Sequence, residues 1–326
     1  MARLRLFANL REIVGATEVS IDGATVGDVL DRATEMFGED FGRALAAAQV
    51  WVDGEQATTA SPVHDGAEIA LIPPVSGGAL VARSPVFLEI GSAAVLAAIL
   101  LVANRSSLQW LSVATVLVGA LWAYDVAGSV ERRGLSVGTA PGVVAVLAGV
   151  LATYRFGAPG MAAATVGATL LVLIWGVVNP SFRSIESIAA GVSIATTAAF
   201  GSASLVLLRL RSEEEAAAFL FVAAVAIAVL WLSDRSDMPV LDPLVAMIVA
   251  AITAGAVAGT VWTPDLLNTV AASVAAALAL VAGRSLGMLL RVGGFFVSGP
   301  IPGNSHYFDG FFMASGPFWL LLTLLG

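Results

Sequence analysis

The sequence predicts a small α+β domain followed by an all-α polytopic membrane domain of about nine helices. Composition is the first reason: 58% of the 326 residues are hydrophobic and only 12% are charged, about half the charged share of a soluble domain. The second is pattern, because apolar runs long enough to span a bilayer begin near residue 86. We therefore expect the α+β domain at 1–78, a linker at 79–85 and the membrane domain at 86–326.

The first part of the chain carries the pattern strand, strand, helix, strand, strand. "ARLRLFA" and "TEVSID" are typical of strands separated by a turn at Gly15. "TVGDVLDRATEMFGEDFGRALAAA" has apolar residues at helical spacing, and Thr25 with Asp28 resembles a capping box. "QVWVDGEQA" indicates a strand that enters an Asp-Gly turn, and "AEIALIPPV" indicates the last strand. This order, in about 75 residues, predicts the β-grasp (ubiquitin-like) fold.

Nine apolar runs follow in the second part of the chain. A transmembrane helix needs about 20 apolar residues, so the third run is short. Residues 284–307 are too rich in Gly and Pro for an ordinary span. The predicted spans are 86–103, 107–127, 141–156, 159–178, 185–208, 216–232, 239–262, 266–283 and 308–325.

The N-terminus and the arginines predict the orientation. "MARLRLFANLREIVG" lacks the continuous apolar core of a signal peptide, so we expect the first domain in the cytosol. If the predicted spans cross the membrane in alternating directions, seven of the arginines that follow the first domain in the sequence lie on the cytosolic side and four lie outside. This excess on the cytosolic side agrees with the positive-inside rule. The sequence thus predicts a multi-pass protein of the cell membrane with a cytosolic N-terminal domain.

The absence of two residue types limits the chemistry. All 16 basic residues are arginine, and cysteine is missing, which excludes disulfides, thiolate metal sites and lysine or cysteine nucleophiles. Residues 1–80 hold 12 Asp/Glu and 5 Arg, so we expect no nucleic acid as a partner, because phosphates require a basic surface. Two interpretations of this acidity stay open: a basic protein partner, or charge that only keeps a small domain soluble.

Charge near the membrane is the best indication of a site there, because charge is costly in lipid. By the predicted topology the following residues face the cytosol: Asp125, Asp234, Arg235, Asp237, Asp242, His306 and Asp309. Such a cluster beside Gly-rich chain favours a site for a lipid headgroup or a nucleotide. The four groups that we expect to converge on one cytosol-facing cavity are Asp234, Arg284, Arg291 and Asp309.

Three segments of the first domain, "LFANLREIVG", "VWVDGEQA" and "HDGAEIALIPPVSGG", resemble a known family. They are similar to the small sulfur-carrier subunit of molybdopterin synthase and its relative in the thiamine pathway. In that family an activating enzyme adenylates the terminal glycine carboxylate, which then becomes a thiocarboxylate. The resemblance implies Gly78 as the acceptor and Gly77 as the slender residue before it. It also implies a cytosolic protein partner, such as the activating enzyme or the large synthase subunit.

The chain departs from this family at the tail. Gly78 is in a peptide bond to Ala79 and therefore has no free carboxylate. Three interpretations stay open: a protease cuts after Gly78, the domain serves only as a docking module, or the glycines are a hinge. We expect "SGGALVARSP" to be an extended, exposed linker, because Gly77 and Gly78 disfavour regular structure and Pro85 biases Ser84 away from helix.

The second part of the chain carries another resemblance. "WAYDVAGSVERRGLSVGTAPGVV" and "SGPIPGNSHYFDGFF" are similar to phosphatidate cytidylyltransferases, which join CTP to phosphatidate and release diphosphate. The resemblance implies a phosphatidate-like membrane lipid and CTP as ligands, with Mg²⁺ held by Asp234 and Asp309. Together with His306, these two aspartates are the candidate catalytic residues. The candidate substrate- or phosphate-binding residues are Arg284, Arg291 and Asn304. The two arginines would contribute positive charge around the phosphates.

Several departures predict that this site has lost or changed its chemistry. Asn304 stands where the PGHGG motif of the family has histidine, and Phe312 replaces its second signature aspartate. Lysine is missing, and arginine does not simply replace it at a point contact. Asp234 and Asp309 thus have a second interpretation, as loop or helix-cap residues. Two functions stay open: a degenerate nucleotidyltransferase, or a non-catalytic membrane scaffold. A second copy of the chain is a further candidate partner, which would make the protein a homodimer.

Overall fold

The computed structural model forms two compact units, Met1–Ala82 and Arg83–Gly326. It describes residues 2–6, 10, 14–38, 41–42, 45, 49–72, 86–234, 242–263, 265–294, 301–303 and 305–326. The division between the units falls inside the predicted linker, 79–85, which lies outside the described residues. Each unit is therefore described by itself.

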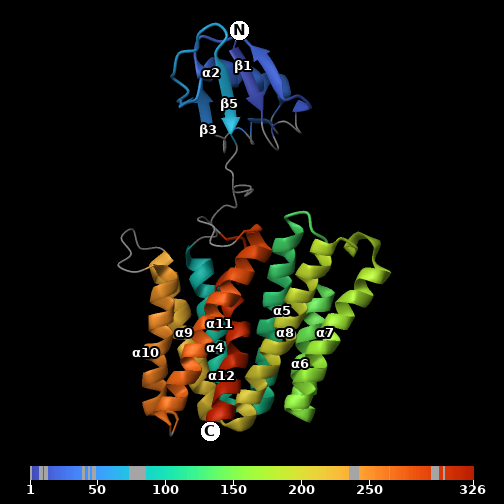
Figure 1. Cartoon of the computed structure of the whole chain (residues 1–326), viewed down its shortest axis with the longest axis vertical. Coiled ribbons are helices and arrows are strands. Elements are labelled where there is room, and N and C mark those ends of the chain that lie inside the picture. The colour runs from blue at the N-terminus through green and yellow to red at the C-terminus, as the bar shows by residue number, and fades with distance from the viewer. Residues whose placement is uncertain are drawn as a thin grey trace. The chain divides into compact units, whose positions relative to one another are not determined.

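The N-terminal unit is a five-stranded sheet with one long helix on one face (Figure 1). The strand order is β2-β1-β5-β3-β4, with the parallel pair β1 and β5 at the centre and antiparallel neighbours on either side. This topology confirms the predicted β-grasp fold. Its elements are β1 (Ala2–Leu6), β2 (Glu18–Ile21), α2 (Val26–Phe37), β3 (Gln49–Val52), β4 (Glu55–Gln56) and β5 (Glu68–Ile72).

Alternation along the strands produces the core of this unit. In β1 every second side chain is buried, and Leu4 packs with Ile69 of β5 against the apolar face of α2. The predicted capping box is present: the Thr25 hydroxyl accepts from the Asp28 amide at 3.2 Å, and the Asp28 carboxylate accepts from the Thr25 amide at 3.0 Å. The helix is shorter than the apolar pattern suggested. It ends at Phe37, because Gly38 adopts a positive φ of 86° that stops the helical ladder.

An exposed histidine–aspartate pair joins the β3–β4 turn to the loop before β5. His64 Nε2 lies 2.9 Å from Asp53 Oδ2, and the other Asp53 oxygen accepts from the Glu68 amide at 2.9 Å. The carbonyl of Asp65 and the carboxylate of Asp53 raise the pKa of His64 above its ordinary 6.5. The Glu68 amide and His64 lower the pKa of Asp53.

We expect the His64 imidazole to titrate above pH 6.5 in the full-length protein. Its contribution to stability is complete below pH 6.5 and is lost as the pH rises through the higher pKa of the folded state. The chain has two histidines, so NMR of histidine-labelled protein in detergent resolves the titration. Asp53→Asn should bring the pKa back toward 6.5, whereas a wild-type pKa at or below 6.5 would contradict the pairing.

The helical unit contains nine α-helices among its described residues, in agreement with the predicted all-α domain. Seven apolar segments are long enough to cross a membrane, and α6 is a shorter apolar helix. The helices lie side by side, with α11 and α12 in close contact near the middle of the bundle (Figure 1). They are α4 (Val86–Ser106), α5 (Leu108–Glu131), α6 (Ala140–Phe156), α7 (Ala158–Val178), α8 (Ile185–Arg211), α9 (Glu213–Asp234), α10 (Pro243–Val261), α11 (Leu266–Val292) and α12 (Asp309–Leu325).

Helix α11 is longer than the sequence suggested. The predicted span ended at 283, but the helix continues to Val292 and stops at Gly293, whose φ of 87° is left-handed. Charged residues in the extension are tolerated because they are paired inside the protein: Arg284 and Arg291 are both buried and bonded to aspartates. Gly283 packs against Gly310 of α12, so small residues allow a close helix contact here.

Candidate functional site

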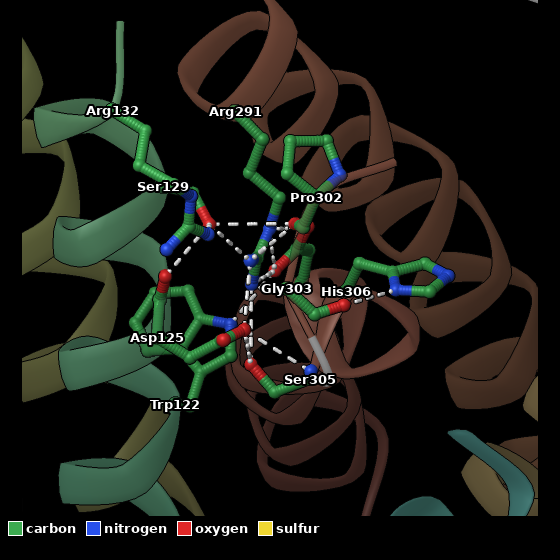
Figure 2. Close-up of polar contacts among 10 residues, drawn as sticks. Trp122, Asp125, Ser129, Arg132, Arg291, Pro302, Gly303, Ser305 and His306 are labelled. Atoms are coloured by element: carbon green, nitrogen blue, oxygen red, sulfur yellow. Dashed lines mark hydrogen bonds and ion pairs between the residues drawn. The ribbon is translucent and has the colours of Figure 1, made fainter. Parts of the chain in front are cut away.

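Arg291 is the centre of a buried polar cluster between α5, α11 and the start of α12 (Figure 2). Its side chain is 0% exposed. Its Nη2 donates to Asp309 Oδ1 at 2.8 Å, its Nε donates to Asp309 Oδ2 at 2.9 Å, and its Nη1 donates to Asp125 Oδ2 at 2.8 Å. One guanidinium thus bonds to two carboxylates that belong to different helices, using the planar fork that distinguishes arginine from lysine.

Helix α5 supplies one side of this cluster. Trp122, Asp125 and Ser129 follow one another at helical spacing and therefore share a face. The Trp122 indole donates to Asp309 Oδ1 at 2.9 Å, and the Ser129 hydroxyl accepts from Arg291 Nη1 at 3.1 Å. Each of these three side chains meets a partner from α11 or α12, so the cluster holds three helices together.

The segment before α12 closes the other side. Ser305 donates through its amide (3.1 Å) and its hydroxyl (2.7 Å) to Asp125 Oδ2, and the Pro302 carbonyl accepts from Arg291 Nη1 at 3.0 Å. Gly303 has a φ of 101°, and a Cβ at that position would overlap the Arg291 guanidinium. Glycine is therefore required for the chain to pass this close to the charged groups.

A second ion pair lies two turns earlier on α11. Arg284 Nη2 donates to Asp234 Oδ2 at 2.6 Å, across to the last residue of α9. The Arg284 guanidinium also stacks on the Tyr307 ring, 5.6 Å from its centroid. His306, the residue before Tyr307, places its Nδ1 2.9 Å from the Gly303 carbonyl oxygen. The two ion pairs are thus joined through η2 (His306–Phe308).

The structure brings together most of the residues that sequence reasoning selected. Asp309 with Arg291, and Asp234 with Arg284, form ion pairs, and His306 lies beside both. The charges pair with one another, and the shared cytosol-facing cavity that we expected stays a prediction. Asn304, Gly77 and Gly78 lie outside the described residues.

Sequence reasoning missed Trp122, Ser129 and Ser305, and it did not assign Asp125 to Arg291. A signal for the first two was present in the spacing of "WAYDVAGS", which puts three polar groups on one helix face. Ser305 carries no such signal, because its partner Asp125 is 180 positions away along the chain.

The arrangement bears directly on metal binding. The described part of the chain contains no group of three or more His, Asp or Glu residues placed to hold a metal ion. Both oxygens of Asp309 already accept hydrogen bonds from Arg291, and Asp234 accepts one from Arg284. The arginines thus use part of the hydrogen-bonding capacity of both carboxylates, and the magnesium site stays a prediction.

The tail of the N-terminal unit is the other candidate site. It follows β5, the central strand, which ends at Ile72, six residues before Gly78. A tail that continues from a central strand is attached to the rigid core of the domain. The predicted acceptor glycine therefore belongs to a domain whose fold is complete before the tail begins.

Comparison with known proteins locates the similarity in this domain. Residues 4–78 match the ThiS family. Small archaeal modifier protein 1 of Haloferax volcanii is 39% identical over 85 residues, which cover 23% of this chain and 97% of that protein. The crystal structure of SAMP1 from Haloferax volcanii shows 38% identity over 24% of this chain and 98% of that chain, with a TM-score of 0.20.

These matches do not show the resemblance of the helical unit to phosphatidate cytidylyltransferases, which stays a prediction. The match to the modifier protein covers nearly the whole of that relative at 39% identity. Through its N-terminal domain, the chain belongs to the ThiS family.

Proposed function

We propose that this protein is a membrane-anchored carrier-type docking protein. Its ThiS-family domain recognises a soluble partner, such as an activating enzyme, while it is still joined to the membrane helices. The observation that supports this proposal most directly is that the family match ends at Gly78, whereas the chain continues with Ala79. The recognition domain is thus present in full, but Gly78 forms a peptide bond with Ala79 where the family has a free terminal carboxylate.

The chemistry of activation supports docking as the function of the uncut chain. Adenylation requires a carboxylate oxygen of the terminal glycine to attack the α-phosphate of ATP and to displace diphosphate. In the uncut protein the Gly78 carbonyl carbon carries the nitrogen of Ala79, so no such oxygen is available. Hydrolysis of this bond would consume one water and create the carboxylate, which makes a released carrier the second candidate function.

The helical unit supports an anchoring role. Seven segments are long and apolar enough to span a membrane, and the two aspartates that nucleotide transfer would need are paired with arginines. We place the anchor in the cell membrane with the ThiS-family domain on the cytosolic side. Seven arginines against four favour this orientation.

Binding and activation can be measured separately with a purified enzyme that adenylates carriers of the ThiS family. We expect full-length protein in detergent to bind that enzyme but to support no ATP–diphosphate exchange. A fragment of residues 1–78 should support exchange, since it ends in a free carboxylate. If the full-length protein neither binds the enzyme nor competes with the fragment, docking is wrong.

The native host distinguishes docking from release. We expect an N-terminally tagged chain to be found at full length in the membrane fraction. A soluble tagged fragment whose intact mass matches residues 1–78, absent in Gly78→Pro, would instead identify the protein as a carrier precursor. Ala79→Ser is a matched control, because it changes the neighbouring residue without the constraint that proline imposes on the backbone.

A further inference from the structure

Both ring nitrogens of His64 face oxygen atoms that accept hydrogen bonds. Nε2 lies 2.9 Å from the carboxylate of Asp53, which is ionised at neutral pH because the Glu68 amide and His64 lower its pKa. Nδ1 lies 3.1 Å from the main-chain carbonyl oxygen of Asp65. A neutral imidazole has one N–H and can donate only one of these bonds, whereas the imidazolium has two and can donate both. The geometry therefore specifies the protonated ring.

The charges around His64 favour that protonated form. The carbonyl of Asp65 and the carboxylate of Asp53 raise the pKa of His64, and the negative charge of Asp65 adds to the effect. The nearby strands contribute two cross-strand pairs, Arg3 with Glu18 (3.9 Å) and Arg5 with Glu68 (2.8 Å). These basic and acidic residues are thus matched with one another, and the two aspartates act on the ring.

His64 belongs to the loop 57–67, which connects β4 to β5 and is attached at two places. The first half of the loop is bonded to the start of α2 by main-chain groups, since the Ser61 carbonyl accepts from the Val26 amide at 3.0 Å. Bonds of this kind do not titrate near neutral pH. The second half is attached to the β3–β4 turn through the His64 ring, because Asp53 lies in that turn.

We propose that residues 64–67 form a pH-sensitive switch in the ThiS-family domain. The switch is closed while the ring is protonated, because His64 then donates to the β3–β4 turn and to its own loop at once. Asp53 and Glu68 remain joined by the main-chain bond from the Asp53 amide to the Glu68 carbonyl (3.0 Å) in either state. Opening therefore loosens residues 64–67 and leaves the sheet intact.

The direction of the response follows from the raised pKa of His64. The closed state is complete below pH 6.5, the ordinary value for histidine, and is lost as the pH rises through the higher pKa of the folded domain. The neutral ring then keeps one N–H and gives up one of its two bonds. The switch is independent of the docking function proposed above, and each can be wrong without the other.

Hydrogen exchange of the full-length protein in detergent tests the switch, with mass spectrometry of peptides from the loop 57–67. The wild type is compared with His64→Gln at each pH, so that the intrinsic dependence of exchange on pH cancels. At a pH about one unit below 6.5 we expect the wild type to exchange about two- to fivefold more slowly, as for other surface ion pairs. About two units above 6.5 the two proteins should exchange alike.

Two further variants connect the effect to the histidine–aspartate pair. Asp53→Asn should exchange like His64→Gln at both pH values, because its side chain keeps an oxygen for the Glu68 amide and loses the charge that faces His64. Glu35→Gln removes an exposed acid from α2 and should behave like the wild type.

Two results would overturn the proposal. The first is a ratio of wild-type to His64→Gln exchange that is the same at both pH values, which would mean that protonation of His64 does not hold the loop. The second is a full wild-type response in Asp53→Asn, since the change with pH would then come from a group other than this pair.

Discussion

Arg291→Met should destabilise the helical unit by about 3–5 kcal/mol, since removing one partner leaves uncompensated buried charges. Two carboxylates lose their counter-ion at once: Asp309, which is 3% exposed, and Asp125, which is 22% exposed. The methionine fills part of the volume but offers no donor to either. The measurement is thermal unfolding in detergent, followed by circular dichroism and by the fraction that elutes as a monodisperse species.

Two further variants assign the loss to charge. Arg291→Met combined with Asp125→Asn and Asp309→Asn should recover part of the stability, because the buried charges are then gone. Arg105→Met is the matched control: Arg105 is 74% exposed and lies 3.4 Å from Glu213, and such surface pairs contribute about 0–1 kcal/mol. Equal melting temperatures for Arg291→Met and the wild type would contradict the central role of Arg291.

Gly201→Leu should separate α8 from α12 and lower the stability by about 1–3 kcal/mol or more. A Cβ at Gly201 would overlap the backbone carbonyl of Phe312. Backbone atoms cannot rotate away as a flexible side chain can, so the helices themselves must move. The same thermal unfolding assay measures the effect, and crosslinking between cysteines placed on α8 and α12 would report the wider spacing.

The control is another helix glycine with free space. Gly167 in α7 has no heavy atom within 4 Å of an added Cβ, so Gly167→Leu should melt within about 0.5 kcal/mol of the wild type. Both variants add the same side chain to a glycine in a helix. A similar loss in both would show that helix propensity or lipid exposure, and not the contact with Phe312, sets the effect.

Local patterns predicted the elements well. The alternation in β1 and the reciprocal bonds of Thr25 and Asp28 depend on residues a few positions apart. The apolar runs also depend on nearby residues only, because the bilayer selects segments by length and hydropathy. The errors occurred where an element ended: α2 stopped early at Gly38, and α11 continued past 283.

The sequence by itself determined that a ThiS-type domain precedes a bundle of membrane helices, and that charged residues gather near one end of several spans. It could not determine which charge meets which. Arg291 pairs with Asp125, 166 positions away, and Asp309 accepts from Trp122, 187 positions away. Only helix packing brings such groups together. Because a buried charge is costly without a partner, the tertiary structure decided the pairing: Arg291 bonds Asp125 and Asp309, and Arg284 bonds Asp234.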